Sequence, residues 1–322
     1  MPSYSQAARD DALFHYTSAD GLIGILGKGE LWSTAYYCTN DDSEFSAGRG
    51  VLTREFERYT RQLIEKDDPL VQVFRQQGID LMETYAKNFE QELVSSTESS
   101  LCAYISCFCM ANGPEDFGHG LLSQWRAYGT DGGYALQFSK KKLQENIKVA
   151  NQKHDLGYDL QDVHYNRDNP LKDEMLSHSD AFLKAYHDRL VEVSDLVKLL
   201  KRGTIPGPLR GLIGGPFESM LDYFVYTKNE HFSEERECRL SYVAPVSRQA
   251  KRHPVHYFNR GGLVVPYTKT PADILPILDC IEWIVVGPSP RIEARFRSIR
   301  EMVRSLGLEI KVRPSHIPFV RV

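Results

Sequence analysis

SEERECRLSYV, residues 233–243, sets acidic and basic side chains beside an apolar run. If residues 235–242 are extended, successive side chains point to opposite faces of a strand. Cys238, Leu240 and Tyr242 then share an apolar face. The other face carries the polar residues Glu235, Glu237, Arg239 and Ser241. This pattern is typical of two structures, a salt-bridged strand on the protein surface and the floor of an active site.

Short apolar or alternating runs predict further strands along the chain. They span residues 13–17, 30–35, 101–110, 132–139, 162–166, 253–258, 262–267, 281–287 and 309–315. Helical spacing predicts helices after Ser18, within 51–95, at 121–129, 171–202 and 207–227, and after residue 288. Because the helices come in blocks and do not alternate strictly with strands, the pattern favours an α+β fold. We expect one domain over residues 1–322, with helical insertions at about 50–98 and 170–228.

The composition is that of an ordinary globular protein, with 42% hydrophobic and 25% charged residues. A net charge of −4 argues against nucleic-acid binding by bulk electrostatics. No run of ~18–20 apolar residues predicts a transmembrane helix, and the N-terminal residues lack the apolar core of a signal peptide. The six cysteines are scattered, which favours buried thiols in a reducing compartment. We therefore expect a cytoplasmic protein with no membrane partner.

Four polar clusters lie on or beside the predicted strands, and each has a structural and a functional interpretation. They are His15 to Thr17, Asn40 to Glu44, Trp125 to Tyr134, and the acidic strand around Glu237. The histidine is either a structural residue or a ligand contact, and the aromatic residues either fill the core or cradle a cofactor. The loop that starts at Asn40 either caps the next helix or holds a divalent cation through oxygen ligands.

The chain also carries, in order, the patterns HYTSADGLIGIL, NDDSE, YISCFC, SQWRAYG, GYALQF, KNEHFSEERECRL, IVVGPSP and SHIPF. This order resembles a widespread bacterial family of unknown function over nearly the whole chain. That family is in turn distantly similar to the ADP-ribosyltransferase superfamily. The resemblance implies a split mixed β-sheet core of ADP-ribosyltransferase type with large helical insertions, and NAD as co-substrate.

The resemblance also implies roles for single residues. In the superfamily a histidine or arginine on the first core strand holds the adenosine-side ribose of NAD, and His15 stands at that place. An aromatic residue on a middle strand packs against nicotinamide, a role for which Tyr134 and Tyr128 both stay open. A glutamate on a late strand bonds the nicotinamide ribose. Glu237 fits this place, with Glu235 as the acid that orients or deprotonates an acceptor.

The expected site thus has two groups of residues. The catalytic residues are expected to be Glu237, Glu235 and Tyr134. The residues expected to bind NAD are His15, Tyr16, Thr17, Trp32, Asn40, Trp125, Tyr128 and Arg239. No metal is expected in this site.

The resulting hypothesis is an NAD-dependent ADP-ribosyltransferase that modifies a nucleic acid or a protein, as a bacterial toxin or phage-defence effector. A neutralising antitoxin is a candidate further partner. Two alternatives stay open. One is a non-catalytic sensor module that binds NAD or ADP-ribose. The other is a metal-dependent nuclease that uses Asp41, Asp42 and Glu44.

Overall fold

The computed structural model describes residues 10–39, 43–76, 103–128, 132–165, 170–174, 222–243 and 253–318, with a few isolated positions between residues 78 and 187. Between residues 43 and 52 it describes the backbone alone. The contacts divide the chain into two compact units. Unit 1 comprises Met1–Cys38, Ala103–Val163 and Glu230–Val322, and unit 2 comprises Thr39–Cys102 and His164–Asn229. The sequence-based expectation of a single domain stays a prediction.

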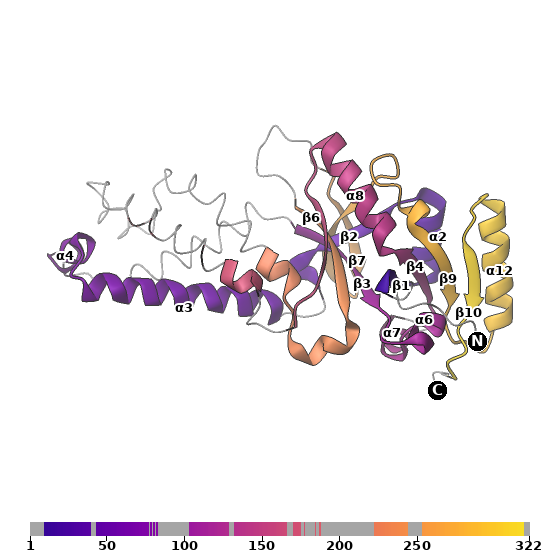
Figure 1. Cartoon of the computed structure of the whole chain (residues 1–322), viewed down its shortest axis with the longest axis horizontal. Coiled ribbons are helices and arrows are strands. Elements are labelled where there is room, and N and C mark those ends of the chain that lie inside the picture. The colour runs from indigo at the N-terminus through magenta and orange to yellow at the C-terminus, as the bar shows by residue number, and fades with distance from the viewer. Residues whose placement is uncertain are drawn as a thin grey trace. The chain divides into compact units, whose positions relative to one another are not determined.

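Within the described part of unit 1, ten strands form one sheet (Figure 1). They are β1 (Ala12–Thr17), β2 (Leu31–Ala35), β3 (Ala103–Met110), β4 (Tyr134–Ser139), β5 (Tyr158–Asp162), β6 (Glu237–Val243), β7 (His256–Arg260), β8 (Leu263–Thr270), β9 (Ile281–Val286) and β10 (Lys311–Pro314). The α-helices of this unit are α2 (Ala19–Lys28), α6 (Pro114–His119), α7 (Leu122–Tyr128), α8 (Lys140–His154) and α12 (Ile292–Ser305). Short 3-10 helices are η1 (Tyr36–Cys38), η3 (Glu230–Glu235) and η4 (Ile277–Cys280).

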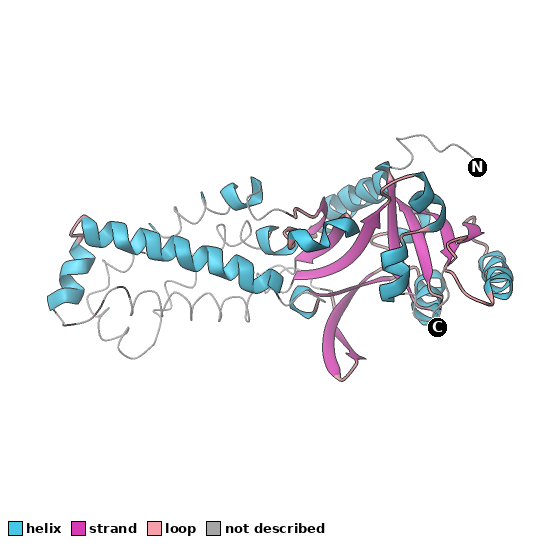
Figure 2. Ribbon diagram, turned by 90° about the horizontal axis from the view of Figure 1, so that it is seen from below, coloured by secondary structure: helices cyan, strands magenta, loops and turns pink. Residues whose placement is uncertain are grey.

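The strands run in the order β10-β9-β4-β1-β3-β2-β8-β7, with β6 paired to β3 and β5 paired to β6. The pair β9–β10 is parallel, and the other described pairs are antiparallel. Figure 2 shows these strands in magenta with helices packed along the sheet. The protein therefore combines α and β structure around a large mixed sheet, which confirms the coarse prediction of fold class.

Unit 2 contains the long helix α3 (Ser43–Glu65) and the shorter helix α4 (Pro69–Gln76). Phe56, Leu63 and Phe74 are buried along these helices, as expected for helices with one apolar stripe. The remaining helical residues predicted within 51–95 and 171–202 lie mostly outside the described residues.

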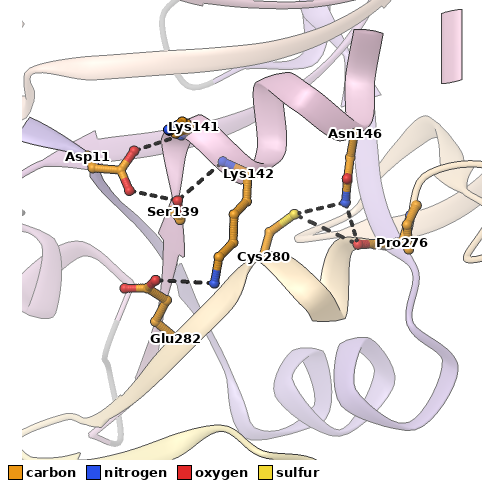
Figure 3. Close-up of polar contacts among 8 residues, drawn as sticks. All are labelled: Asp11, Ser139, Lys141, Lys142, Asn146, Pro276, Cys280 and Glu282. Carbon is orange, nitrogen blue, oxygen red and sulfur yellow. Dashed lines mark hydrogen bonds and ion pairs between the residues drawn. The ribbon is translucent and has the colours of Figure 1, made fainter. Parts of the chain in front are cut away.

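Local sequence signals explain where the helices of unit 1 begin and end. Ser18 caps α2 by accepting a hydrogen bond from the Gly21 amide, and Gly29 ends the helix with a φ of 69°. At the start of α8, the Ser139 side chain accepts a hydrogen bond from the Lys142 amide. The Asp11 carboxylate accepts hydrogen bonds from Ser139 Oγ at 2.6 Å and from the Lys141 amide at 2.7 Å (Figure 3). This cap joins the start of β1 to the junction of β4 and α8.

Two predicted boundaries were wrong. The strand predicted at 162–166 lies earlier, at Tyr158–Asp162, because its partner β6 pairs with those residues. Glycine and proline in ANGPEDFGHG predict a loop over residues 111–120, but this segment contains the short helix Pro114–His119. Proline at the first position of this helix and acidic residues in its first turn favour a helix start.

Candidate functional site

The strand β3 has three neighbours, and this creates a fork in the sheet. On one edge it pairs with β6 along seven residues, Ala103 to Cys109. On the other edge β1 pairs only with Cys109 and Met110, and β2 pairs only with Tyr104 and Ile105. Among the described strands, neither β1 nor β2 pairs with residues 106–108, which lie between these two pairings. We call these three residues, with the diverging ends of β1 and β2, the fork.

Side chains supply hydrogen bonds inside the fork. Nδ1 of His15 lies 3.0 Å from the carbonyl oxygen of Cys107. Ser106 Oγ donates to the Trp32 carbonyl at 3.1 Å and lies 2.7 Å from Ser33 Oγ. Along an antiparallel strand, the backbone groups of successive residues point alternately to the two edges of the strand. The Met110 amide donates to the Arg236 carbonyl on the β6 side, so the backbone groups of Cys107, three residues earlier, point to the opposite edge. There the Cys107 carbonyl is hydrogen-bonded to the His15 side chain.

His15 is a neutral hydrogen-bonding group. Burial lowers the pKa of His15 below the usual histidine value, and the hydrogen bond to the Cys107 carbonyl opposes this effect in part. A carbonyl oxygen only accepts hydrogen bonds, so Nδ1 carries the hydrogen and Nε2 is left as an acceptor. The ring also packs against Phe108, with 5.7 Å between ring centres.

Glu237 and Arg239 form a buried ion pair on β6. Arg239 Nε donates to Oε1 of Glu237 at 2.8 Å, and its Nη2 donates to Oε2 at 3.1 Å. The side chains of Glu237 and Arg239 are 3% and 1% exposed, although they lie on the polar face of β6, which pairs with β3 and β5. The pairing involves both carboxylate oxygens and holds the group in one orientation. The interpretation as a salt-bridged surface strand was therefore wrong.

Glu235 does not belong to this strand. It ends the 3-10 helix η3, and β6 begins at Glu237. Arg236 between them has a φ of 42°, a left-handed conformation that breaks the extended chain. The Arg236 guanidinium donates to the Ala111 carbonyl at 2.8 Å. The prediction that Glu235 and Glu237 share one strand face was wrong for this reason.

The strand register sorts the expected site residues onto two faces of the sheet. Glu237 lies opposite Cys109, and Cys109 lies opposite Phe14, so these three share one face, called here the first face. His15, the next residue after Phe14, points to the second face, where Phe108 also lies. The sequence predicts that the side chains of His15 and Glu237 converge on one hollow that binds NAD, but the register places them on opposite faces of the sheet.

Tyr16 and Trp125 lie in the core beneath the first face. The Tyr16 hydroxyl accepts a hydrogen bond from the Leu121 amide at 2.7 Å, and its burial raises the pKa of Tyr16. Trp125 is 1% exposed and donates from Nε1 to the His119 carbonyl at 2.9 Å. The two rings pack edge to face. Both side chains therefore hold helices α6 and α7 against the sheet.

Tyr134 and Thr17 lie opposite each other on β4 and β1, and by register they share the second face with His15. The Tyr134 hydroxyl accepts a hydrogen bond from Nε of Arg295 at 3.2 Å, and the guanidinium also lies over the ring. Tyr128, at the end of α7, is 45% exposed. Tyr134 and His15 thus share a face that Glu237 does not.

Trp32 lies on the first face and is 45% exposed. Its ring stacks on Tyr267 with 4.3 Å between ring centres. Cys107, on the neighbouring strand β3, is the exposed member of the described cysteines, which are Cys38, Cys107, Cys109, Cys238 and Cys280. Sequence analysis missed Cys107 as a site residue, because the sequence of this strand does not show which of its cysteines tertiary packing leaves exposed.

The acidic loop lies outside this description. Asn40, Asp41 and Asp42 are outside the described residues, and of Glu44 only the backbone is described. The remaining described residues contain no cluster of three or more histidine, cysteine, aspartate or glutamate side chains suited to a metal ion. The nuclease hypothesis therefore rests on residues beyond those described.

A separate hollow of about 490 Å³ opens at the start of β9 and β10. Trp283, Lys142 and Glu282 are among its lining residues. Lys142 Nζ lies 3.4 Å from Glu282 Oε1 across it (Figure 3). Three strands, β9, β4 and β1, lie between β10 and the β3 fork, so this hollow is distinct from the fork.

Residues 124–240 match a protein family described as a protein of unknown function (DUF2971). The match covers well under half of the chain. It includes Trp125, Tyr134 and the Glu237–Arg239 pair, and it ends before β7. No curated protein and no solved structure matches the chain. Within the described residues, no helix combines the length and the apolar character needed to cross a membrane.

Proposed function

We propose that the chain is an NAD-dependent ADP-ribosyltransferase that modifies a macromolecular acceptor, either a nucleic acid or a protein. The observation that supports this best is Glu237, a buried carboxylate held at both oxygens by Arg239 on a strand beside β3. The opposite edge of β3 receives β1, which carries His15. The proposed ribose-binding histidine and the proposed catalytic glutamate thus come from two of the three strands that pair with β3.

A fixed carboxylate at Glu237 suits the cleavage of NAD. Cleavage of the nicotinamide–ribose bond builds positive charge on the sugar, as in glycoside cleavage. A fixed carboxylate stabilises charge that exists only in the transition state, and such groups typically contribute ~3–4 kcal/mol. Because Arg239 already orients Glu237, the carboxylate itself needs little reorientation once NAD is bound.

The two residues with proposed roles in NAD binding and catalysis lie on opposite faces of the sheet. His15, with Nε2 as an acceptor, receives a hydrogen bond from a ribose hydroxyl on the adenosine side. Glu237 on the first face stabilises the nicotinamide ribose. A dinucleotide that contacts both residues must pass between β1 and β2 beside Cys107, where neither described strand pairs with residues 106–108, and must widen the gap that His15, Ser33 and Ser106 now fill. Because Glu237 is only 3% exposed, NAD binding must also displace the groups that cover it.

The test is incubation of the purified protein with NAD labelled in the adenylate and a total lysate, with and without nuclease. We expect release of nicotinamide and a labelled macromolecule. Glu237→Gln should lower turnover at least a hundredfold, while the same substitution at Glu234, which is exposed in η3, should leave it unchanged. Circular dichroism and thermal unfolding establish that both variants fold. Full turnover by a folded Glu237→Gln variant overturns the proposal.

The Glu237–Arg239 pair also favours a second candidate, a module that binds NAD or ADP-ribose without turnover. Both carboxylate oxygens already accept hydrogen bonds from Arg239, which neutralises the charge that catalysis requires. Calorimetry distinguishes the two candidates, because the module binds NAD and releases no nicotinamide over hours. Nucleic-acid cleavage that needs no NAD and is abolished by EDTA instead selects the metal-dependent nuclease.

A toxin or phage-defence role suits a bacterial enzyme of this type, by analogy. Toxicity of the wild-type gene and its loss in Glu237→Gln on induced expression test this role.

A further inference from the structure

Three aromatic side chains on β2, β8 and β7 form a cluster on the first face of the sheet. They are Trp32, Tyr267 and Phe258. Trp32 stacks on Tyr267, and its ring centre lies 6.1 Å from that of Phe258. Phe258 in turn packs edge to face against Tyr267. We call this cluster, with the basic residues beside it, the aromatic ledge.

Within the ledge, Tyr267 is the base and Trp32 is the exposed surface. Tyr267 is 7% exposed and Trp32 is 45% exposed. Stacking on Tyr267, with 27° between the ring planes, holds the indole ring in place. An aromatic ring that is rigid on one side and open to solvent elsewhere can accept a second flat ring at little cost in side-chain entropy.

Basic side chains surround these rings. The exposed Arg260 places its guanidinium 5.2 Å from the centre of the Phe258 ring. Lys269 lies directly opposite Trp32 in the strand register, and its Nζ is 3.6 Å from Glu30. His256 packs against Tyr267. The ledge thus combines stacking surfaces with positive charge, although the whole chain has a net charge of −4.

We propose that the aromatic ledge binds the unpaired bases of a single-stranded nucleic acid. Sheet surfaces with exposed aromatic rings stack bases, and neighbouring cations contact the phosphates. Trp32 provides the stacking surface. Arg260 and Lys269 supply the charge complementary to the backbone. A double strand hides the faces of its bases, so the ledge discriminates against it.

The ledge and Glu237 lie on the same face of the sheet. Thr34, two residues after Trp32, is opposite Ile105, and Ile105 is opposite Ser241 on β6. Side chains two residues apart share a face, so Trp32 and Glu237 are on one side with β3 between their strands. Binding of a nucleic acid by the ledge does not depend on catalysis. The further statement that the bound strand accepts ADP-ribose rests on the proposed function.

The experiment measures fluorescence anisotropy of short labelled oligo(dT) and oligo(U) with the full chain, in the absence of NAD. Competitors are an abasic strand with the same number of phosphates and a short duplex. We expect both oligonucleotides to bind better than the competitors, and their ratio distinguishes DNA from RNA. Trp32→Ala should weaken binding at least tenfold, and Trp32→Phe much less. Lys269→Gln should lower the slope of log affinity against log salt by ~1.

Tyr257→Ala is the matched control, because Tyr257 is 65% exposed on the opposite face of β7. It should bind like the wild type. The proposal is overturned by absence of binding, by equal affinity for the abasic strand, or by unchanged affinity in Trp32→Ala. If the protein binds oligonucleotides through Trp32 but never consumes NAD, this inference holds and the proposed function is overturned. If it consumes NAD but binds no oligonucleotide, the proposed function holds and this inference is overturned.

Discussion

Glu237 and Arg239 stand two residues apart on β6, and Arg239 donates to both oxygens of the Glu237 carboxylate. Residues two apart on a strand point the same way, so the pair is set up by local geometry. Tertiary packing then buries both side chains almost fully. A buried ion pair of this kind contributes little net stability to the fold, because the cost of removing both charges from water offsets their strong mutual attraction.

Removal of one member of the pair should therefore destabilise the protein strongly. Arg239→Met removes the guanidinium that donates to both oxygens of the buried carboxylate, which we expect to lower the free energy of unfolding by ~3–5 kcal/mol. The double variant Glu237→Leu/Arg239→Met should lose much less than the sum of its single variants. Urea unfolding of the four proteins measures this. Additive losses would show that the pair is not coupled.

Tyr16 should behave as a structural residue. Tyr16→Phe leaves the buried Leu121 amide without its acceptor, at a cost of ~1–3 kcal/mol in the free energy of unfolding. The affinity for NAD should not change in this variant, because the hydroxyl is already engaged. Chemical unfolding and calorimetry are the two measurements. A large loss of NAD affinity without loss of stability would restore the cofactor-binding role expected from the sequence.

Gly287 lies against the Trp125 ring and should not tolerate a side chain. A methyl group at this position would stand 2.7 Å from the Gly133 carbonyl oxygen and 2.8 Å from the indole ring. We expect Gly287→Ala to cost at least ~1–3 kcal/mol of stability. Gly27→Ala in α2 is the control, since nothing lies within 4 Å of the added methyl group. Thermal unfolding should show a lower midpoint for Gly287→Ala alone.

Stability should fall as the solution becomes acidic. Burial lowers the pKa of His15 and of His253 in the folded protein. The unfolded chain, with histidine pKa values near ~6.5, therefore binds more protons below that pH, so stability is present above it and is lost as the pH falls. His15→Gln should reduce this dependence. Urea unfolding from pH 7 to pH 5 tests it, and an identical slope in the variant would contradict the assignment.

The rate at which a thiol reagent modifies Cys107 should show whether NAD occupies the fork. It is exposed, whereas Cys109 and Cys238 are buried, and burial raises the pKa of Cys238 and lowers its reactivity. A thiol reagent should therefore modify Cys107 first in the native protein. If NAD passes through the fork, saturating NAD should slow this modification several-fold. Peptide mapping by mass spectrometry follows the sites, and an NAD-independent rate at Cys107 would argue against NAD in the fork.

Much of the local structure follows from the sequence. The cap at Ser18 and the stop at Gly29 predict α2, and the apolar spacing of Ile299 and Val303 predicts α12. The alternation of Cys238 with Arg239 predicts β6, although not its start. That start depends on the left-handed conformation of Arg236, which a non-glycine residue adopts only when its surroundings require it.

Periodicity and capping signals predict most of the described strands and helices, because they act between residues a few positions apart. Which strands are neighbours depends instead on contacts between residues far apart in the chain. The fork beside Cys107, the burial of Glu237 with Arg239, and the separation of His15 from Glu237 all depend on the register of β3 with its partners. A shift of one residue in that register would move a side chain to the other face. No single strand contains the information that sets it.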